Sequence, residues 1–266
     1  MRDLVVYGLG ELGQLYGAAA LRAGIRVTPI TRADEPKRVL SGFALDVPVL
    51  VAVGEADLDD VLSSLGQARG QATILLQNEL FPSAWRQHEM NPTVLVPWLM
   101  KKRGTPLLVA RPSPVFGLHA ELVVALHRAL DVPVLNLRDA QALHQALVDK
   151  YAFILTVNAL GLLRDRTLGM WLQEDPLRVD ALAREAAQLG AALCEQGVAA
   201  SPAPGAAGLD LSLSVAAVIE AMRALSAVGA RGRTAAARVA RAREHGARLG
   251  LGLPELARVA EQARRA

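Results

Sequence analysis

The sequence predicts an α/β protein with a parallel sheet in its N-terminal half and helices alone in its C-terminal half. Short β-branched runs alternate with helical stretches over the first half, which is typical of a parallel sheet with crossover helices. After about residue 139 the strand-like runs disappear, and apolar residues recur at spacings of three and four. The chain has 266 residues, of which 52% are apolar, and this is enough for two separate cores. We therefore expect two domains, at residues 1–138 and 139–266.

Each half can be divided into expected elements. In the first half we expect strands at 4–7, 26–31, 48–53, 72–76 and 133–136, with further extended runs at 93–99 and 105–110. The helices expected there are 11–23, 57–65 and 118–130. In the second half we expect helices at 142–163, 177–195, 211–227, 238–249 and 254–264, with an Ala/Pro/Gly connector at 199–208. Because Pro29 would lack a ladder N–H inside its strand, we expect a bulge there.

Composition excludes several classes of protein. The formal net charge is only +3, and the single cysteine, Cys194, excludes an internal disulfide and a cysteine-based zinc site. The histidines show no metal-ligand spacing, so no metal is expected. No secretory signal is expected, and the longest strongly apolar run, 151–163, is too short for a membrane span. We therefore expect a cytoplasmic protein that binds no membrane.

Arginines are concentrated near the C-terminus. A helical stripe there, which contains Arg231, Arg238, Arg241 and Arg248, could in principle bind nucleic acid. No aromatic side chain lies in this stretch to stack on bases, so we interpret the stripe as a solvated helix face. Pairing with acidic residues of a second subunit is the alternative, and an Ala-rich helical domain could support a homodimer.

The strongest local motif is a glycine-rich turn between the first expected strand and the first expected helix. Its residues are Gly8, Leu9, Gly10, Glu11, Leu12 and Gly13. In a dinucleotide-binding turn the first glycine permits the tight bend, the second leaves room for the pyrophosphate, and the third lets helix and sheet pack closely. The helix N-terminus then offers free N–H groups to the phosphates. The motif predicts a Rossmann-type domain, although a glycine-rich turn in another α/β protein is the alternative.

The end of the second strand indicates which dinucleotide would bind. An NAD site usually has a carboxylate there, whereas an NADP site has an arginine. Here Arg32 follows Thr31, and Lys37 and Arg38 come shortly after, whereas Asp34 is expected in the loop. We therefore expect NADP, the alternative being that these basic residues are solvated loop charges.

A second group of candidate residues lies near the expected domain junction. Asn78 follows the fourth strand, at the edge of an α/β sheet where ligands bind. Lys150 is one of only four lysines beside twenty-five arginines, and it can give up a proton that arginine cannot. Asn158 is eight residues further on, two turns along the same helical face. A surface lysine with its stem on apolar neighbours is the alternative for Lys150.

Together these residues resemble the ketopantoate reductase (2-dehydropantoate 2-reductase) family, within the 6-phosphogluconate-dehydrogenase-like reductases. The resemblance extends over most of the chain, and its residues are 8–13, Arg32, 51–53, 76–78, Lys150, Asn158 and 252–254. It implies a two-domain NADP-dependent oxidoreductase that acts on CH–OH groups, with a Rossmann-type domain followed by a helical substrate and dimerisation domain. It also implies that Lys150 is the general acid, that Asn78 and Asn158 hold the substrate, and that Asn78 also contacts the cofactor.

The sequence departs from the family pattern on the substrate side. Ile154 stands where the family has a further asparagine, and Gly54 where it has a lysine near the cofactor. The family's glutamate on a later helix has no counterpart that we can place, Glu220 being the only nearby acid. The hypothesis is therefore an NADPH-dependent reductase of a small 2-oxo acid or related carbonyl compound. An NADP(H)-binding sensor or scaffold with little or no catalysis is the alternative.

Overall fold

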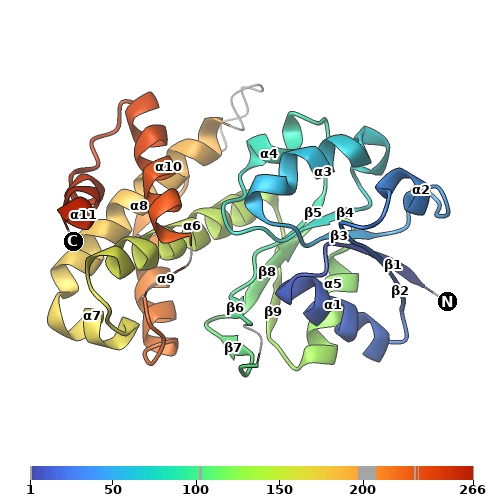
Figure 1. The fold of residues 1–266 in the computed structure, drawn as a ribbon, viewed down its shortest axis with the longest axis horizontal. Coiled ribbons are helices and arrows are strands. Elements are labelled where there is room, and N and C mark those ends of the chain that lie inside the picture. The colour runs from blue at the N-terminus through green and yellow to red at the C-terminus, as the bar shows by residue number, and fades with distance from the viewer. Residues whose placement is uncertain (1, 102–103, 197–207, 231, 233, 266) are drawn as a thin grey trace. The chain divides into compact units, whose positions relative to one another are not determined.

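The computed structural model describes residues 2–101, 104–196, 208–230, 232 and 234–265. The chain forms two compact units, Met1–Leu143 and His144–Ala266 (Figure 1). The first unit holds the sheet and the second is built from helices, so the predicted fold class is confirmed.

The first unit is built on a seven-stranded sheet. Its strands are β1 (Asp3–Tyr7), β2 (Arg26–Ile30), β3 (Val49–Val51), β4 (Thr73–Leu75), β5 (Thr93–Leu95), β8 (Ser113–Phe116) and β9 (Val134–Asn136). They lie in the order β2-β1-β3-β4-β5-β8-β9, and each pair is parallel except β5 with β8. Two short strands, β6 (Leu99–Met100) and β7 (Leu108–Val109), form a separate antiparallel pair.

Strand β8 was missed by the sequence prediction. Its segment has prolines at positions 112 and 114, which usually argue against a strand. The carbonyl of Pro114 nevertheless accepts a hydrogen bond from Val96 N at 2.8 Å, because an antiparallel partner needs only the acceptor at that position. The sheet is consequently mixed rather than wholly parallel.

The expectation of a bulge at Pro29 was wrong. Pro29 lies in unbroken register opposite Val6, with Leu4 to Tyr7 pairing with Val27 to Ile30. Strand β2 is the edge strand of the sheet, so the missing N–H of Pro29 breaks no ladder.

Helices connect the strands of the first unit. They are α1 (Glu11–Arg22), α2 (Pro36–Leu40), α3 (Leu58–Leu65), α4 (Pro82–Arg86) and α5 (Ala120–Leu130), with short 3₁₀ turns at Glu55–Asp57 and Gln67–Arg69. The sequence predicted α1, α3 and α5, whereas α2 and α4 are single turns too short to show periodicity.

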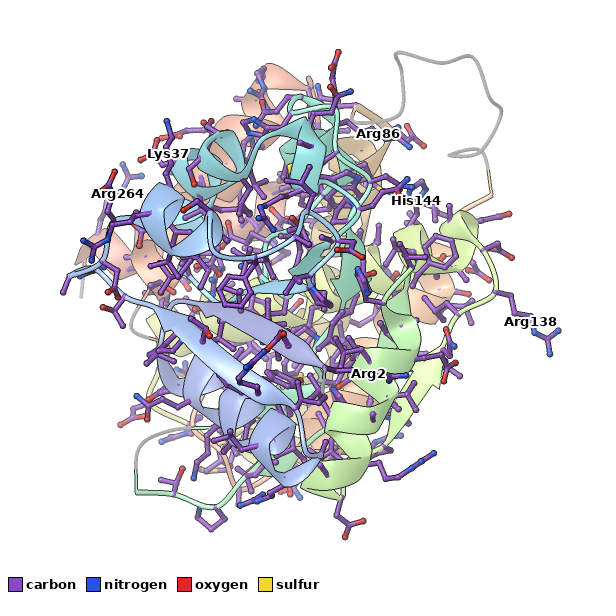
Figure 2. All side chains as sticks on the ribbon, turned by 90° about the vertical axis from the view of Figure 1, so that its right-hand side faces the viewer. Arg2, Lys37, Arg86, Arg138, His144 and Arg264 are labelled. Atoms are coloured by element: carbon purple, nitrogen blue, oxygen red, sulfur yellow. The ribbon has the colours of Figure 1, made fainter. Side chains whose placement is uncertain are left out.

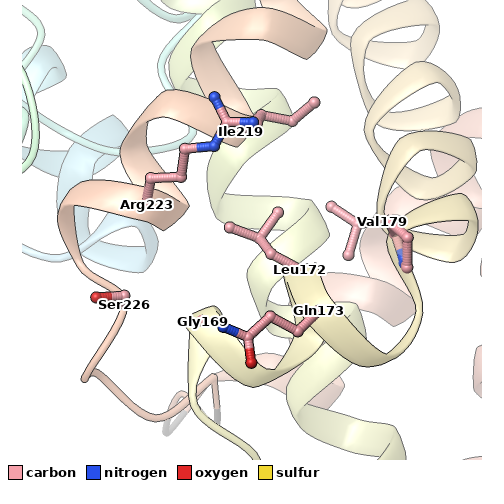
Figure 3. Close-up of a pocket in the computed structure, with 8 residues that line it drawn as sticks. Gly169, Leu172, Gln173, Val179, Ile219, Arg223 and Ser226 are labelled. Atoms are coloured by element: carbon pink, nitrogen blue, oxygen red, sulfur yellow. The ribbon is translucent and has the colours of Figure 1, made fainter.

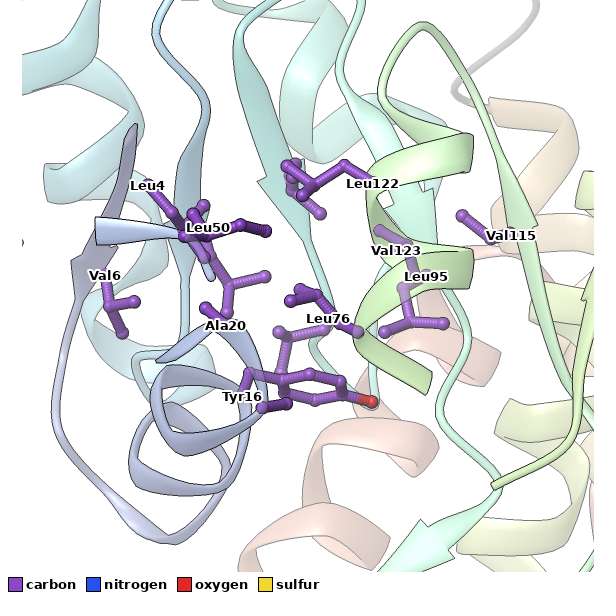
Figure 4. Close-up of a cluster of buried hydrophobic side chains, with 14 of the residues drawn as sticks. Leu4, Val6, Tyr16, Ala20, Leu50, Leu76, Leu95, Val115, Leu122 and Val123 are labelled. Carbon is purple, nitrogen blue, oxygen red and sulfur yellow. The ribbon is translucent and has the colours of Figure 1, made fainter. Parts of the chain in front are cut away.

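The core of the first unit lies between the sheet and the helices α1 and α5 (Figure 4). Leu4, Leu50 and Leu95 from three strands are buried there. One polar link crosses this core, since the hydroxyl of Tyr16 on α1 lies 3.0 Å from Nε2 of His127 on α5. Full burial of a large apolar side chain, such as each of these leucines, stabilises the fold by about 1.5–3 kcal/mol.

The second unit is helical. Its helices are α6 (Ala140–Leu163), which begins just before the unit boundary, α7 (Leu168–Glu174), α8 (Pro176–Gln196), α9 (Leu211–Ala224), α10 (Ala235–Arg248) and α11 (Pro254–Arg265). Helix α7 was not predicted, although Thr167 marks its start by accepting a hydrogen bond from Met170 N. Apart from the isolated bridge between Thr167 and Gly229, the described residues of this unit form no strand. Most of the predicted connector at 199–208 lies outside the described residues.

Helix α6 is the core helix of the second unit. Among the described residues it alone is long and apolar enough to cross a membrane, but 78% of its most apolar window is buried. Such burial is typical of the central helix of a globular domain. Helix α11 is fastened at its start by Glu185 of α8, whose carboxylate accepts hydrogen bonds from Glu255 N at 2.7 Å and Leu256 N at 3.0 Å.

Candidate functional site

The glycine-rich turn follows β1 and opens α1, as the sequence predicted. Gly8 has a φ of +93°, which L side chains rarely adopt, and a Cβ there would lie 2.8 Å from the carbonyl oxygen of Ala52. A Cβ on Gly13 would lie only 1.9 Å from the carbonyl oxygen of Gly8. These two glycines are therefore required by the packing of the protein itself.

Gly10 differs from both. Its φ is −67°, which any residue adopts, and among the described residues a Cβ there would meet only the carbonyl oxygen of Ala52, at 4.0 Å. Gly10 is also the N-cap of α1, so the first N–H groups of the helix are left without a capping side chain. A helix N-terminus with open space above it is suited to a phosphate group. The turn thus fits a dinucleotide diphosphate.

A cavity of about 640 Å³ lies beside this turn. Its lining residues are Tyr7, Gly8, Leu9, Gly10, Ile30, Thr31, Arg32, Asp34, Pro36, Ala52, Val53, Gly54, Asp57, Asp60 and Val61. The structure therefore brings together Gly8, Leu9, Gly10 and Arg32 of the predicted cofactor residues. Of the others, Glu11 lines a separate hollow, and Leu12 packs against the core.

Of the charged groups of this cavity, Arg32 and Asp34 follow β2, whereas Asp57 ends the 3₁₀ turn after β3 and Asp60 lies on α3. The Arg32 side chain is 97% exposed and lies 3.6 Å from the carboxylate of Asp57. Asp34 folds back onto the end of β2, where its carboxylate accepts hydrogen bonds from Thr31 N at 2.8 Å and Thr31 Oγ1 at 2.7 Å. These bonds lower the pKa of Asp34, so it carries a fixed negative charge. Lys37 is exposed (Figure 2).

Gln77 has a role that the sequence did not indicate. It is buried, and its Nε2 donates to the carbonyl oxygen of Val51 at 2.8 Å, while its Oε1 accepts from Leu76 N. This amide ties the end of β4 to the end of β3, and so holds the loop that lines the cavity at Val53. Asn78, the predicted ligand, is half-buried and is not part of the cavity lining.

Lys150 lies on α6 and is not a surface lysine, because only 5% of it is exposed. Its Nζ lies 5.6 Å from the centre of the Phe153 ring. Burial, followed by the positive charge of Arg238, lowers the pKa of Lys150 from 10.5 to about 7. An amine with this pKa can donate a proton and regain it near neutral pH.

Asn158 lies two turns further along α6 and is 5% exposed. Its Nδ2 donates to the carbonyl oxygen of Ile154 at 2.6 Å, whereas its buried Oδ1 has no hydrogen-bond partner among the described residues. A Cβ on Gly232 would lie 2.6 Å from this Oδ1. Gly232 therefore lies close to the Asn158 amide, where a side chain would have no room.

Asp149, beside Lys150, belongs to a polar network that joins α6 to the start of α9. Its Oδ1 accepts hydrogen bonds from Ser214 Oγ at 2.6 Å and Gln145 Nε2 at 2.8 Å. Gln145 Oε1 accepts from Asp210 N at 2.9 Å, and Asp210 caps α9 through Ser212 N. The network fixes the position of α9 relative to α6 within the helical unit.

The predicted solvated arginine stripe is wrong at one position. Arg238 on α10 is only 6% exposed, whereas Arg241 is half-buried and Arg248 is exposed. Arg231 lies outside the described residues. The burial of Arg238 was not predicted, because an arginine in a stretch rich in arginine is expected on the solvent-facing side of its helix.

Two further findings concern other possible sites. Among the described residues, no three His, Cys, Asp or Glu side chains gather as a metal site would need. A second cavity, of about 400 Å³, lies in the helical unit between α7, α8 and α9, with Arg223 and Gln173 among its lining (Figure 3).

Solved structures share this fold over almost the whole chain. A D-mandelate dehydrogenase in a ternary structure with NADH and anilino(oxo)acetate has a TM-score of 0.67 at 13% identity, covering 99% of this chain and 98% of that chain. A ketopantoate reductase from Ralstonia eutropha JMP134 has a TM-score of 0.59 at 18% identity, with the same two coverages. A dimeric ketopantoate reductase from Staphylococcus aureus has a TM-score of 0.56 at 14% identity, covering 99% and 98%.

No protein-family model and no curated protein sequence matches the chain. The structural likeness to ketopantoate reductases predicted from the sequence is confirmed at the level of the fold.

Proposed function

We propose that this chain is an NADPH-dependent oxidoreductase that acts on CH–OH groups and reduces a small 2-oxo acid or related carbonyl compound. The observation that carries the proposal is the cavity at the glycine turn, where Gly10 leaves open the space that a diphosphate needs. The shared fold with ketopantoate reductases and a D-mandelate dehydrogenase supports the same class of reaction. In this proposal residues 1–138 bind the dinucleotide, and residues 139–266 bind the substrate and support a homodimer.

The cofactor would be held by the turn at Gly8, Gly10 and Gly13, with its diphosphate at the start of α1. When bound, NADPH supplies a hydride to the carbonyl carbon of the substrate. Arg32 favours NADPH over NADH, because its exposed guanidinium can pair with the 2′-phosphate. Asp34 supports the competing choice of NADH, since a fixed carboxylate at the end of β2 can accept hydrogen bonds from ribose hydroxyls.

Lys150 would be the general acid. Hydride addition to a carbonyl leaves an alkoxide, and an ammonium in hydrogen-bonding reach stabilises the charge and donates the proton. A pKa of about 7 suits this role, because the proton is released readily near neutral pH. Asn78 and Asn158 would hold the substrate with neutral hydrogen bonds.

The setting would be the cytoplasm, with no nucleic acid or membrane as partner. The buried α6 supports a soluble protein, and a dimeric structural relative supports a homodimer.

A sensor or scaffold that binds NADP(H) without efficient catalysis is the second candidate. It is favoured by the departures at Ile154 and Gly54, and by the Asn158 amide, which already bonds to its own helix.

Absorbance at 340 nm during NADPH oxidation with a panel of 2-oxo acids tests the proposal. Turnover supports the reductase, whereas NADPH binding without turnover for any of the acids supports the sensor. With a working substrate, Lys150→Ala should lower kcat by about 10²–10⁴ and leave NADPH affinity within a few-fold. Lys150→Arg should not restore activity, because a guanidinium does not release its proton near neutral pH. Near-normal turnover in Lys150→Ala would show that another group is the acid.

A further inference from the structure

The cavity beside the glycine turn is lined by more negative than positive charge. Of its described lining residues Arg32 is the one cation, whereas three are carboxylates, Asp34, Asp57 and Asp60. One positive and three negative formal charges leave a net charge of −2 on the lining. The 2′-phosphate gives NADPH about two negative charges that NADH lacks. The acidic side chains of the lining therefore affect the choice between these two cofactors.

Asp57 differs from the other two carboxylates because it pairs with Arg32. Its carboxylate lies 3.6 Å from Nη2 of Arg32, and the side chains of Asp57 and Arg32 are 57% and 97% exposed. Asp34 is instead hydrogen-bonded to Thr31 at the end of β2, and Asp60 lies one turn further along α3. Asp57 is thus the lining carboxylate that contacts the proposed 2′-phosphate ligand.

The ion pair between Arg32 and Asp57 lies over the end of β1. Strand β1 lies between β2 and β3 in the sheet, Arg32 follows β2, and Asp57 ends the 3₁₀ turn after β3. The glycine turn begins where β1 ends, so the pair is at the carboxyl edge where a dinucleotide would bind. An NADP site uses an arginine at this edge for the 2′-phosphate. Asp57 and the phosphate would therefore compete for one guanidinium.

Competition for Arg32 weakens only the binding of the cofactor that needs this side chain. A guanidinium binds a phosphate best through two parallel N–H donors. Because Nη2 of Arg32 faces Asp57, a phosphate that uses this nitrogen must displace the carboxylate. An ion pair between two exposed side chains is weak, so the displacement reduces the affinity for NADPH without preventing binding. NADH has no 2′-phosphate and leaves the ion pair intact.

We propose that Asp57 is a specificity-determining residue for the cofactor: by pairing with Arg32, it lowers the preference for NADPH over NADH. This inference rests on the proposed function, since it concerns the cofactor of the same site. Arg32 and Asp57 then act in opposite directions, because Arg32 provides the preference for NADPH and Asp57 reduces it.

The test measures the dissociation constants of NADH and NADPH by fluorescence titration of the full-length protein, and compares their ratio among variants. The ratio cancels any effect of Asp57 on the diphosphate, which both cofactors carry. Asp57→Asn removes the charge and keeps the shape. Asp59→Asn is the matched control, because Asp59 is an exposed carboxylate of α3 outside the cavity lining.

At about 20 mM salt, where exposed charges are little screened, Asp57→Asn should raise the ratio of the NADH to the NADPH dissociation constant roughly three- to fivefold. Asp59→Asn should leave this ratio unchanged. Adding Asp57→Asn to Arg32→Ala should also leave it unchanged, because no guanidinium remains to be released. No rise in Asp57→Asn, an equal rise in Asp59→Asn, or the same rise with and without Arg32 would overturn the role of Asp57.

Asp57→Asn should stay folded, because the Asp57 side chain makes no capping hydrogen bond to α3 and asparagine is an equally good N-cap. Melting temperatures check this, and if Asp57→Asn is unfolded, the uncharged N-cap variant Asp57→Ser decides.

The binding ratio also separates this proposal from the proposed reductase. If the ratio depends on Asp57 as expected but no 2-oxo acid is reduced, the reductase is wrong and the role of Asp57 stands. If a 2-oxo acid is reduced but the ratio does not change in Asp57→Asn, the role of Asp57 is wrong and the reductase stands. Binding of neither cofactor would overturn both.

Discussion

The two glycines at the start of α1 predict opposite consequences for the same substitution. In Gly13→Ala the new Cβ would lie 1.9 Å from the carbonyl oxygen of Gly8, so the backbone of the turn must move. Overpacking of this kind costs about 1–3 kcal/mol, which corresponds to a fall in melting temperature of roughly 3–10 °C. In Gly10→Ala the new Cβ would be 4.0 Å from the carbonyl oxygen of Ala52, an ordinary contact.

Gly10→Ala should therefore leave the fold intact and damage only cofactor binding. Alanine is a poorer N-cap than glycine by about 1 kcal/mol or less, but it reduces the freedom of the unfolded chain by a similar amount. The melting temperature should stay within about 2 °C. The methyl group would occupy the space assigned to the diphosphate, so NADPH should bind roughly ten- to a hundredfold more weakly.

Thermal unfolding and a fluorescence titration of NADPH, carried out on both variants, check this pair of outcomes. Undiminished NADPH affinity in Gly10→Ala would refute the placement of the diphosphate above α1. A melting temperature unchanged by Gly13→Ala would refute the packing argument for the turn.

Three further predictions concern the cofactor charge, the buried lysine and a helix cap. Arg32→Ala should weaken NADPH binding roughly ten- to a hundredfold and leave the affinity for NADH nearly unchanged, as measured by titration of both cofactors. Equal losses of affinity for the two cofactors would show that Arg32 does not bind the 2′-phosphate. Folding lowers the pKa of Lys150 from 10.5 to about 7, so burial of the charged lysine side chain disfavours the folded state. This unfavourable contribution to stability is smallest above pH 10.5 and grows as the pH falls towards 7. Urea unfolding should accordingly find Lys150→Met more stable than the unchanged protein at pH 7, by a margin that shrinks as the pH rises to 9; a margin independent of pH would contradict the lowered pKa. Glu185→Ala should destabilise the protein by about 0.5–2 kcal/mol, because the hydrogen bonds that cap the start of α11 are lost. Glu185→Gln should be less destabilised, because its amide oxygen can still accept one of these hydrogen bonds. Equal stability of the unchanged protein and both variants in urea would show that the cap contributes nothing.

Local sequence patterns predicted the sheet, most of the helices and the glycine turn. Strands β1 to β4 are continuous β-branched runs between turn residues, and this pattern depends on neighbours in the sequence. Gly8 and Gly13 could be assigned in the same way, because the strand, turn and helix that need them are contiguous.

Features that depend on distant contacts could not be predicted. Strand β8 needs its antiparallel partner β5 before its prolines are tolerated. Gln77 acquires its function only when β3 lies beside β4. Arg238 follows three alanines in a stretch rich in arginine, and only the packing of α10 in the helical unit buries it.

In the proposed reaction this protein transfers hydride from the nicotinamide to the carbonyl carbon of a 2-oxo acid. NADPH carrying deuterium in both positions at C4 of the nicotinamide, incubated with the protein and a panel of 2-oxo acids, tests it directly by mass spectrometry. We expect a 2-hydroxy acid that carries one deuterium at C2. NADPH bound by the protein, with no deuterium in the product of any of the acids, would contradict it.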